Sequence, residues 1–549
     1  MEHSALHATE LIGLVIALGG VFFMVGLFGP AQRAAAAPSS GELGQVFSVN
    51  ATKWVVRGAL LVAGATVLGL FVDVAEAKGK TVFNGVDFSL VWEFAVHTRV
   101  GRLAVARIAV LLLMAGAARL PGHFKWWLTG SIGFGAVILA STVSHAAAQP
   151  VGRWPMMLAQ VAHTTAAALW VGVLIQLLAA RPAIEGTAGA GGVALLSEIV
   201  RRFSPVALAV TSLLGLSGLL MIFRFLGEFG AVPTSSYGLT LIVKLLMLLP
   251  AIYAGAVNYR VIRPPLAAFA AGAKGPDASE TDGLRRKFGK MLELEVTAGI
   301  LVILVAGILA SVSPPGEEGA YRATSYQMHA MLSPRLPAVD VANPANFYGA
   351  DMRGLDDLRY AEFTHHWSGV MVLFLGLGWL LQSFRGKVGK WAGYGWPLLL
   401  VPFAAFVTVA SDPEVWLLHK LSFREVIGDP QLLEHQLGAV MILVLVWLGW
   451  RDLRKPDANR PLGYALPGIF IAGGILLLGH AHSTLTITEG VINLINLEHA
   501  VFGAFILLGG VTRWLSLREL LPRRTANFIW PCMIMGLGVF MAFFYREVE

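Results

Sequence analysis

Long apolar blocks separated by short polar segments run through the whole chain. A helix that crosses the hydrocarbon core of a membrane needs ~20 mostly apolar residues, and about fourteen blocks have this character. Their cores are residues 8–28, 54–73, 103–119, 127–146, 157–179, 204–225, 239–259, 290–312, 364–382, 395–410, 435–450, 463–479, 499–515 and 528–544. The pattern predicts an all-α polytopic membrane protein with about 14 transmembrane helices.

Lysine and arginine collect in alternate connections between these blocks. The connection after the seventh block is strongly basic, with Arg260, Arg263 and Arg285, whereas residues 314–362 are acidic. Basic loops face the cytoplasm, so the alternation places both termini on the opposite, outer side (N-out/C-out). The first block lacks a basic region before it, and we expect a retained helix rather than a signal peptide.

A natural boundary lies at residues 313–316, which read Ser-Pro-Pro-Gly and cannot continue a helix. We therefore divide the chain into an eight-helix bundle (residues 1–315), an outer connection (residues 316–362) and a six-helix, histidine-rich bundle (residues 363–549).

The composition agrees with a membrane protein. The hydrophobic set makes up 56% of residues and charged residues 14%, whereas soluble domains are roughly a quarter charged. The formal net charge of +7 comes from the basic loops that set the orientation of the helices in the membrane. We therefore expect membrane lipids, and no nucleic acid, as partners. The single cysteine, Cys532, can form neither a disulfide framework nor a CxxC metal site. Since no hydrolytic or nucleotide-binding motif rises above chance, we expect no enzymatic activity.

Histidine is distributed unequally between the two predicted faces. Of the 14 histidines, only His123 falls on the inner side. The others are His3, His7, His97, His145, His163, His329, His365, His366, His419, His435, His480, His482 and His499. Neutral imidazole suits copper, zinc and iron, and ionisable groups in a membrane are costly unless they serve a function. The set predicts a copper-binding surface on the outer face.

The spacing of these residues adds candidate ligands. His3 and His7 are four residues apart, which puts both on one helix face. Glu93 precedes His97 by the same interval, so its carboxylate can orient the imidazole. Methionine, the soft ligand for Cu(I), flanks His329. The predicted metal ligands are His3, His7, His97, His145, His163, His366, His435, His480, His482, His499, Met328, His329 and Met331.

The two bundles repeat one pattern. A helix leaves the membrane with His145 or with His480, and the next helix enters with His163 or His499. Two antiparallel neighbours would bring such imidazoles to one depth. Paired histidines beside glycine and alanine can also hold haem axially, so haem b is an alternative cofactor to copper. Its predicted ligands are His366, His435, His480 and His499.

Several sequence motifs in the first bundle occur together in one known family. Residues 237–249 read YGLTLIVKLLMLL, residues 254–260 read AGAVNYR, residues 292–296 read LELEV and residues 311–315 read SVSPP. Ser144-His145-Ala146 and the segment from His163 to Gly172 precede them. The combination resembles the copper resistance protein D family (CopD/PcoD-like inner-membrane proteins) over roughly residues 1–315. The positions that match the family are Lys244, Asn258, Arg260, Glu293 and Glu295.

The resemblance implies a multi-pass protein of the bacterial inner membrane that moves or receives copper, with its histidine face toward the periplasm. It also implies a small periplasmic copper-binding protein as a partner. Three functions stay open at this stage. The first is copper capture for uptake, delivery or resistance. The second is electron transfer through a b-type haem, and the third is an anchor or accessory subunit in a larger membrane complex.

Overall fold

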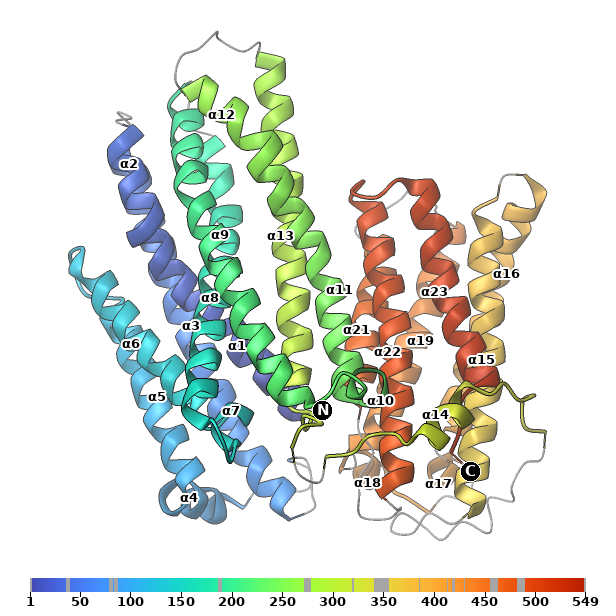
Figure 1. Ribbon diagram of the computed structural model, residues 1–549. Coiled ribbons are helices and arrows are strands. Elements are labelled where there is room, and N and C mark those ends of the chain that lie inside the picture. Colours follow the sequence, from blue (N-terminus) through green and yellow to red (C-terminus); the bar gives the residue numbers. More distant parts are fainter. Residues whose placement is uncertain are drawn as a thin grey trace.

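The computed structural model describes residues 2–35, 40–78, 82, 87–185, 190–270, 278–317, 320–339, 355–384, 386–411, 413–416, 420–428, 430–454, 463–480 and 489–547. Within these ranges every regular element is helical, and the helices stand side by side in two adjoining bundles (Figure 1). Both marked chain ends lie toward the end of the bundles opposite α12 (Figure 1).

The first bundle contains α1 (Glu2–Phe22), the π-helical η1 (Phe23–Phe28), α2 (Gly29–Ala35), α3 (Ser40–Ala77), α4 (Phe88–His97), α5 (Arg99–Ala117), α6 (Phe124–Ser141), α7 (His145–Ala148), α8 (Arg153–Glu185), α9 (Ala190–Leu226), α10 (Ala231–Thr234), α11 (Ser236–Val257), the π-helical η3 (Asn258–Ile262), α12 (Arg263–Ala270) and α13 (Ala278–Leu309). The remaining helices are α14 (Ser325–Leu332), α15 (Leu355–Gln382), α16 (Lys387–Ala410), α17 (Pro413–Trp416), α18 (Phe423–Gly428), α19 (Pro430–Arg454), α21 (Ala465–Gly479), α22 (Glu489–Leu517) and α23 (Arg523–Phe543).

Each of the fourteen predicted apolar blocks falls on one of the long helices. In the described part of the chain, eleven helical stretches are long and apolar enough to cross a membrane. The other three blocks belong to α6, α15 and α21. Helix α21 has only 15 residues, α6 has a lysine and two tryptophans in its first turn, and the first part of α15 is charged. The all-helical, polytopic class is confirmed, whereas the N-out/C-out orientation stays a prediction.

Helix α1 is the centre of the first bundle. It packs against α3, α8 and α13, and Leu14, Val15 and Phe28 in α1 and η1 are almost fully buried. The crossing of α1 and α8 is very close, because a Cβ placed on Gly19 would lie 2.3 Å from the Cα atom of Gly172. Small residues allow this approach, as they commonly do between membrane helices.

The two bundles share an apolar seam. Val243 and Met247 of α11 and Val305 of α13 pack with Leu478 and Leu507 of the second bundle. Ion pairs support one end of the seam, about midway along α13: Glu293 pairs with Arg518, and Lys290 Nζ lies 3.1 Å from Glu519 Oε2. At the other end, a Cβ on Gly479 would lie 3.7 Å from Ser4 Oγ, so the start of α1 touches the end of α21.

Several short helices, α4 and α14 among them, are absent from the sequence prediction. Helix α4 occupies a segment that reads as a mixed, polar connection, and Asp87 caps it by accepting a hydrogen bond from Leu90 N. Helix α14 lies in the predicted outer connection, where Thr324 and Gln327 form a reciprocal capping box. Hydrophobic periodicity predicts neither helix, because both are short and both are fixed by caps and by tertiary packing.

Candidate metal centres

Two histidines and three carboxylates gather where α1 begins. We call His3, His7, Glu10, Asp73 and Glu76 the α1 entry cluster. His3 Nε2 lies 2.7 Å from Glu76 Oε2 and 3.8 Å from Asp73 Oδ1 on α3. The rings of His3 and His7 are stacked with centroids 6.3 Å apart. The predicted pairing of the two imidazoles on one helix face is therefore present, and the carboxylates are partners that spacing along one helix could not reveal.

Glu10 fixes the inner edge of this cluster. Its Oε1 atom lies 2.8 Å from an Arg107 guanidinium nitrogen and accepts a hydrogen bond of 2.8 Å from Thr66 Oγ1. Its other oxygen is 3.8 Å from His7 Nδ1. Three helices, α1, α3 and α5, are thus tied together beneath the exposed imidazoles.

The other predicted ligands of the first bundle lie apart from one another. His97 is exposed at the end of α4. His145 Nδ1 is 3.1 Å from Glu317 Oε1, and its Nε2 is 3.1 Å from the Ala310 carbonyl oxygen. His163 lies ten residues into α8, with Nδ1 3.1 Å from Ser217 Oγ on α9. The contacts of His145 and His163 are thus with different helices and segments, not with each other.

Family-related positions of η3 and α13 form a polar group inside the first bundle, together with Trp170 of α8. The Trp170 indole donates to Glu295 Oε1 over 3.4 Å, and Asn258 Nδ2 donates to its other oxygen over 3.1 Å. Glu293, two residues away, instead forms the ion pair with Arg518 across the seam. Lys244 interacts electrostatically with His163. Lys244 is thus placed near a histidine, a neighbour that the sequence did not reveal.

Four histidines on or next to four helices lie near one another in the second bundle. We call His435, His480, His499 and His365 the imidazole row. The ring centroids of His435 and His480 are 5.7 Å apart, those of His480 and His499 are 4.8 Å apart, and those of His499 and His365 are 5.5 Å apart. The row runs from the start of α19 past the end of α21 to α22 and α15, and His480 and His499 are buried.

The Nδ1 atom of three of these rings is engaged by an oxygen acceptor. His365 Nδ1 lies 2.8 Å from the Ala361 carbonyl oxygen, and His499 Nδ1 lies 2.8 Å from that of Ile495. His480 Nδ1 bonds the carboxylate of Glu434. Metal-ligating histidines usually donate the non-ligating N–H to such an oxygen, which fixes the tautomer and the ring orientation.

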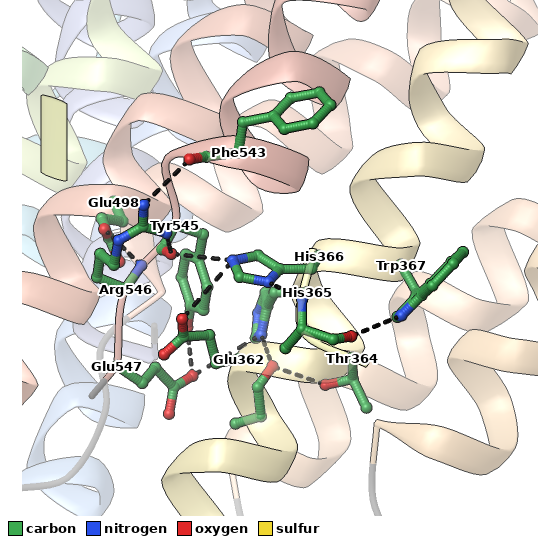
Figure 2. Close-up of polar contacts among 12 residues, drawn as sticks. Glu362, Thr364, His365, His366, Trp367, Glu498, Phe543, Tyr545, Arg546 and Glu547 are labelled. Carbon is green, nitrogen blue, oxygen red and sulfur yellow. Dashed lines mark hydrogen bonds and ion pairs between the residues drawn. The ribbon is translucent and has the colours of Figure 1, made fainter. Parts of the chain in front are cut away.

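His366 has a different role from its neighbour His365. Its Nδ1 accepts a hydrogen bond of 3.0 Å from Ala338 N, and its Nε2 donates to the Tyr545 carbonyl oxygen over 3.1 Å. Figure 2 shows His366 between α15 and the segment that follows α23. Both ring nitrogens hold the backbone of distant segments together. Of the two adjacent histidines, the sequence prediction selected His366, whereas the structure places His365 in the row.

We expect His366→Ala to destabilise the protein by about 2 kcal/mol or more, because a buried donor and a buried acceptor lose their partner. Its copper content should stay that of the wild type. Thermal unfolding and metal analysis of the purified variant would check both results, with His97→Ala as an exposed control. Loss of copper from folded His366→Ala would contradict the structural role.

The remaining predicted ligands do not converge. Met328 and Met331 lie in an apolar cluster with Leu494 and Leu497 of α22, and His329 is exposed on α14. His482 lies outside the described residues. Within the described residues, no group of three or more His, Cys, Asp or Glu side chains could hold a metal ion as arranged. Copper and haem ligation by the predicted residues therefore stays a prediction.

Sequence reasoning left out several members of these groups. Asp73 and Glu76 come from α3, about seventy residues after His3, and only packing brings them together. Glu434 directly precedes His435 in the sequence, but it bonds His480. The signal available in the sequence was the pair His365-His366 itself, which could not show which ring faces which neighbour.

In this helical, polytopic membrane protein, imidazoles and carboxylates, which are side chains that can ligate metal ions, gather at helix ends. Residues 4–153 match the family model described as "Copper resistance protein D-like, N-terminal domain", and residues 197–309 match "Copper resistance protein D". This part of the chain thus matches the copper resistance protein D family, which confirms the resemblance predicted from its motifs. Residues beyond 309 match neither model.

A curated relative supports this assignment. "Copper transport protein CutJ" of Bacillus subtilis (strain 168) is 23% identical over 277 residues, which is 49% of this chain and 47% of the relative. The alignment thus spans about half the length of each protein. No solved structure matches the chain.

Proposed function

We propose that the protein captures copper at the periplasmic face of the bacterial inner membrane, for uptake, delivery or resistance. The α1 entry cluster is the proposed place of capture, and its composition is the observation that carries the proposal. Two imidazoles and three carboxylates from α1 and α3 meet at one end of the bundle. The family match and the copper transport relative indicate which metal.

The chemistry of the cluster suits this role. Imidazole nitrogen and carboxylate oxygen are ligands for Cu(II), and the carboxylates also attract a cation from solution. The side chains of His3 and His7 are 32% and 42% exposed, so an ion can reach them. Copper is cargo in this proposal, and no chemical reaction is required. A periplasmic copper-binding protein as donor is proposed from the family alone.

The interior of the first bundle favours loading over passage. Beyond the entry cluster, the half-buried histidine His163 lies near Lys244. An ammonium group repels a copper cation, and the low dielectric of the bundle strengthens the repulsion. We therefore propose that copper is held at the outer end and handed on there, rather than conducted along α8.

The test is copper binding by the purified full-length protein. We expect His3→Ala/His7→Ala to weaken copper affinity at the entry cluster by at least about 10-fold, because both nitrogen ligands are lost. The melting temperature should change little, since both side chains are partly exposed. His97→Ala is the matched control, an exposed histidine outside the cluster. Wild-type affinity in the double variant would refute capture at this site.

A further inference from the structure

Helix α4 lies at the end of the first bundle, between the long helices α3 and α5 in the chain. Figure 1 shows it at the foot of that bundle, below α5. Thr98 forms the corner between the two helices: its backbone is extended, and its hydroxyl accepts a hydrogen bond of 2.9 Å from Gly101 N. A Cβ on Gly101 would lie 2.1 Å from the Phe94 carbonyl oxygen. The corner is therefore tight, and α4 does not continue the line of α5.

The side chains of α4 divide into three faces. The first face is apolar and packs against Leu70 and Val74 of α3 and Ala104 of α5. It consists of Leu90, Val91, Phe94 and Ala95. The second is an exposed apolar stripe of Phe88, Trp92 and Val96, the first two 73% and 70% exposed. The third is exposed and polar, with Ser89, Glu93 and His97. At about 100° per residue, the apolar stripe lies between the packed face and the polar face.

This order of faces fits a helix at the boundary of protein, lipid and water. A helix that lies in the plane of a membrane buries its apolar face about 5–10 Å into the layer between headgroups and acyl chains, and its polar face stays in water. Tryptophan is enriched at this depth. A water-exposed stripe of Phe88 and Trp92 would have no such compensation for its large apolar surface.

The surroundings of the stripe also indicate lipid as its partner. Exposed apolar side chains resume just beyond the corner, with Val100 and Val105 on α5, a helix long and apolar enough to cross a membrane. Arg99 and Arg102, at the start of α5, are exposed as well. Long basic side chains next to an apolar surface reach toward lipid phosphates. Both the continuity of the apolar surface and the charge beside it match a phospholipid headgroup layer.

We propose that α4 is an anchor in the membrane interface, on the side of the membrane where the α1 entry cluster opens. Its occupant is the phospholipid surface, which receives Phe88, Trp92 and Val96 between its headgroups. Glu93 and His97 face water.

The anchor holds the two helices that complete the α1 entry cluster. Phe88 contacts Phe71 of α3 with ring centroids 5.8 Å apart, and Lys78 Nζ lies 3.2 Å from Asp87 Oδ2 at the cap of α4. These contacts bracket Asp73 and Glu76 along α3. On α5, Ala104 packs on α4 and lies one turn before Arg107, the partner of Glu10. Lipid contact of α4 thus sets the positions of the carboxylates, and this effect on copper rests on the proposed function.

Spin labels test the lipid contact without copper. The chain has one cysteine, so Cys532→Ala gives a background into which Trp92→Cys or Glu93→Cys is introduced. The labelled full-length proteins are placed in nanodiscs of phosphatidylethanolamine and phosphatidylglycerol. We expect the Trp92→Cys label to be open to oxygen and several-fold less accessible to a water-soluble nickel chelate than the Glu93→Cys label. Equal access of the chelate to both labels, or exclusion from both, would overturn the proposal.

Copper binding in the same nanodiscs tests the effect on the cluster. We expect Phe88→Ser/Trp92→Ser to weaken copper affinity by about 10-fold, because the carboxylates lose their fixed position. The matched control is Trp154→Ser/Phe229→Ser, which removes two comparably exposed aromatic rings that lie outside α4. Both variants should melt near the wild-type temperature. Wild-type affinity in Phe88→Ser/Trp92→Ser, or an equal loss in the control, would overturn the coupling. Unchanged affinity in His3→Ala/His7→Ala would refute the capture site, and the labels alone would then decide the lipid contact.

Discussion

Replacing Glu10 by alanine is expected to destabilise the protein by about 3–5 kcal/mol, because it leaves the Arg107 charge buried and unpaired. The two side chains are only 14% and 8% exposed, with oxygen and nitrogen 2.8 Å apart. Thr66 loses its hydrogen bond to the same carboxylate. Thermal unfolding in detergent would measure the loss.

The double variant Glu10→Met/Arg107→Met separates charge from packing. Removing both partners leaves no unpaired charge, so most of the lost stability should return. Copper affinity at the entry cluster should stay low in both variants, because His7 has lost the carboxylate 3.8 Å from its Nδ1. A single variant that melts at the wild-type temperature, or a double variant no more stable than the single one, would contradict the assigned role of the pair.

Gly172→Ala is expected to disrupt the crossing of α1 and α8 and to cost about 3 kcal/mol, at the upper end of the range for overpacking. A Cβ at this position would lie 2.2 Å from the Val15 carbonyl oxygen and 2.7 Å from the Gly19 Cα atom. Both obstacles are backbone atoms, so no side-chain rotation relieves the overlap. The helices must separate, and the entry cluster on α1 would shift with them.

Gly64→Ala provides the comparison on α3. A Cβ there meets no atom within 4 Å, and alanine is favoured over glycine in a helix by about 0.5–1 kcal/mol. We expect wild-type or slightly higher stability and wild-type copper binding. Equal melting temperatures for the two glycine variants would show that the close crossing contributes little.

The helices of this fold could be predicted because a membrane imposes a length and an apolar character on each of them. All fourteen apolar blocks coincide with helices, and the three that fall short of a full span are those with a polar first turn or few residues. Helices α4 and α14 could not be predicted in the same way. Neither is long enough to carry a periodic signal, and their capping residues are common in loops as well.

The sequence predicted which residue types make up the candidate sites. It did not predict which of these residues lie next to one another. Spacing along one helix correctly placed His3 beside His7. It could not place Asp73 and Glu76 beside them, since those carboxylates arrive through the packing of α3 on α1. It also could not distinguish His365 from His366, because adjacent residues on a helix point about 100° apart. Only the positions of α22 and of the residues after α23 determine which ring joins the row.

The length of α21 has a consequence for where the imidazole row lies. Its 15 residues extend roughly 22 Å, whereas the hydrocarbon core of a bilayer is about 30 Å thick. His480, at the end of this helix, would then lie below the level of the headgroups, in a local thinning of the lipid or a recess in the protein surface. Hydrophobic mismatch of this kind is sensitive to lipid chain length. The thickness of the host membrane thereby becomes part of the environment of His480 and of the imidazoles beside it.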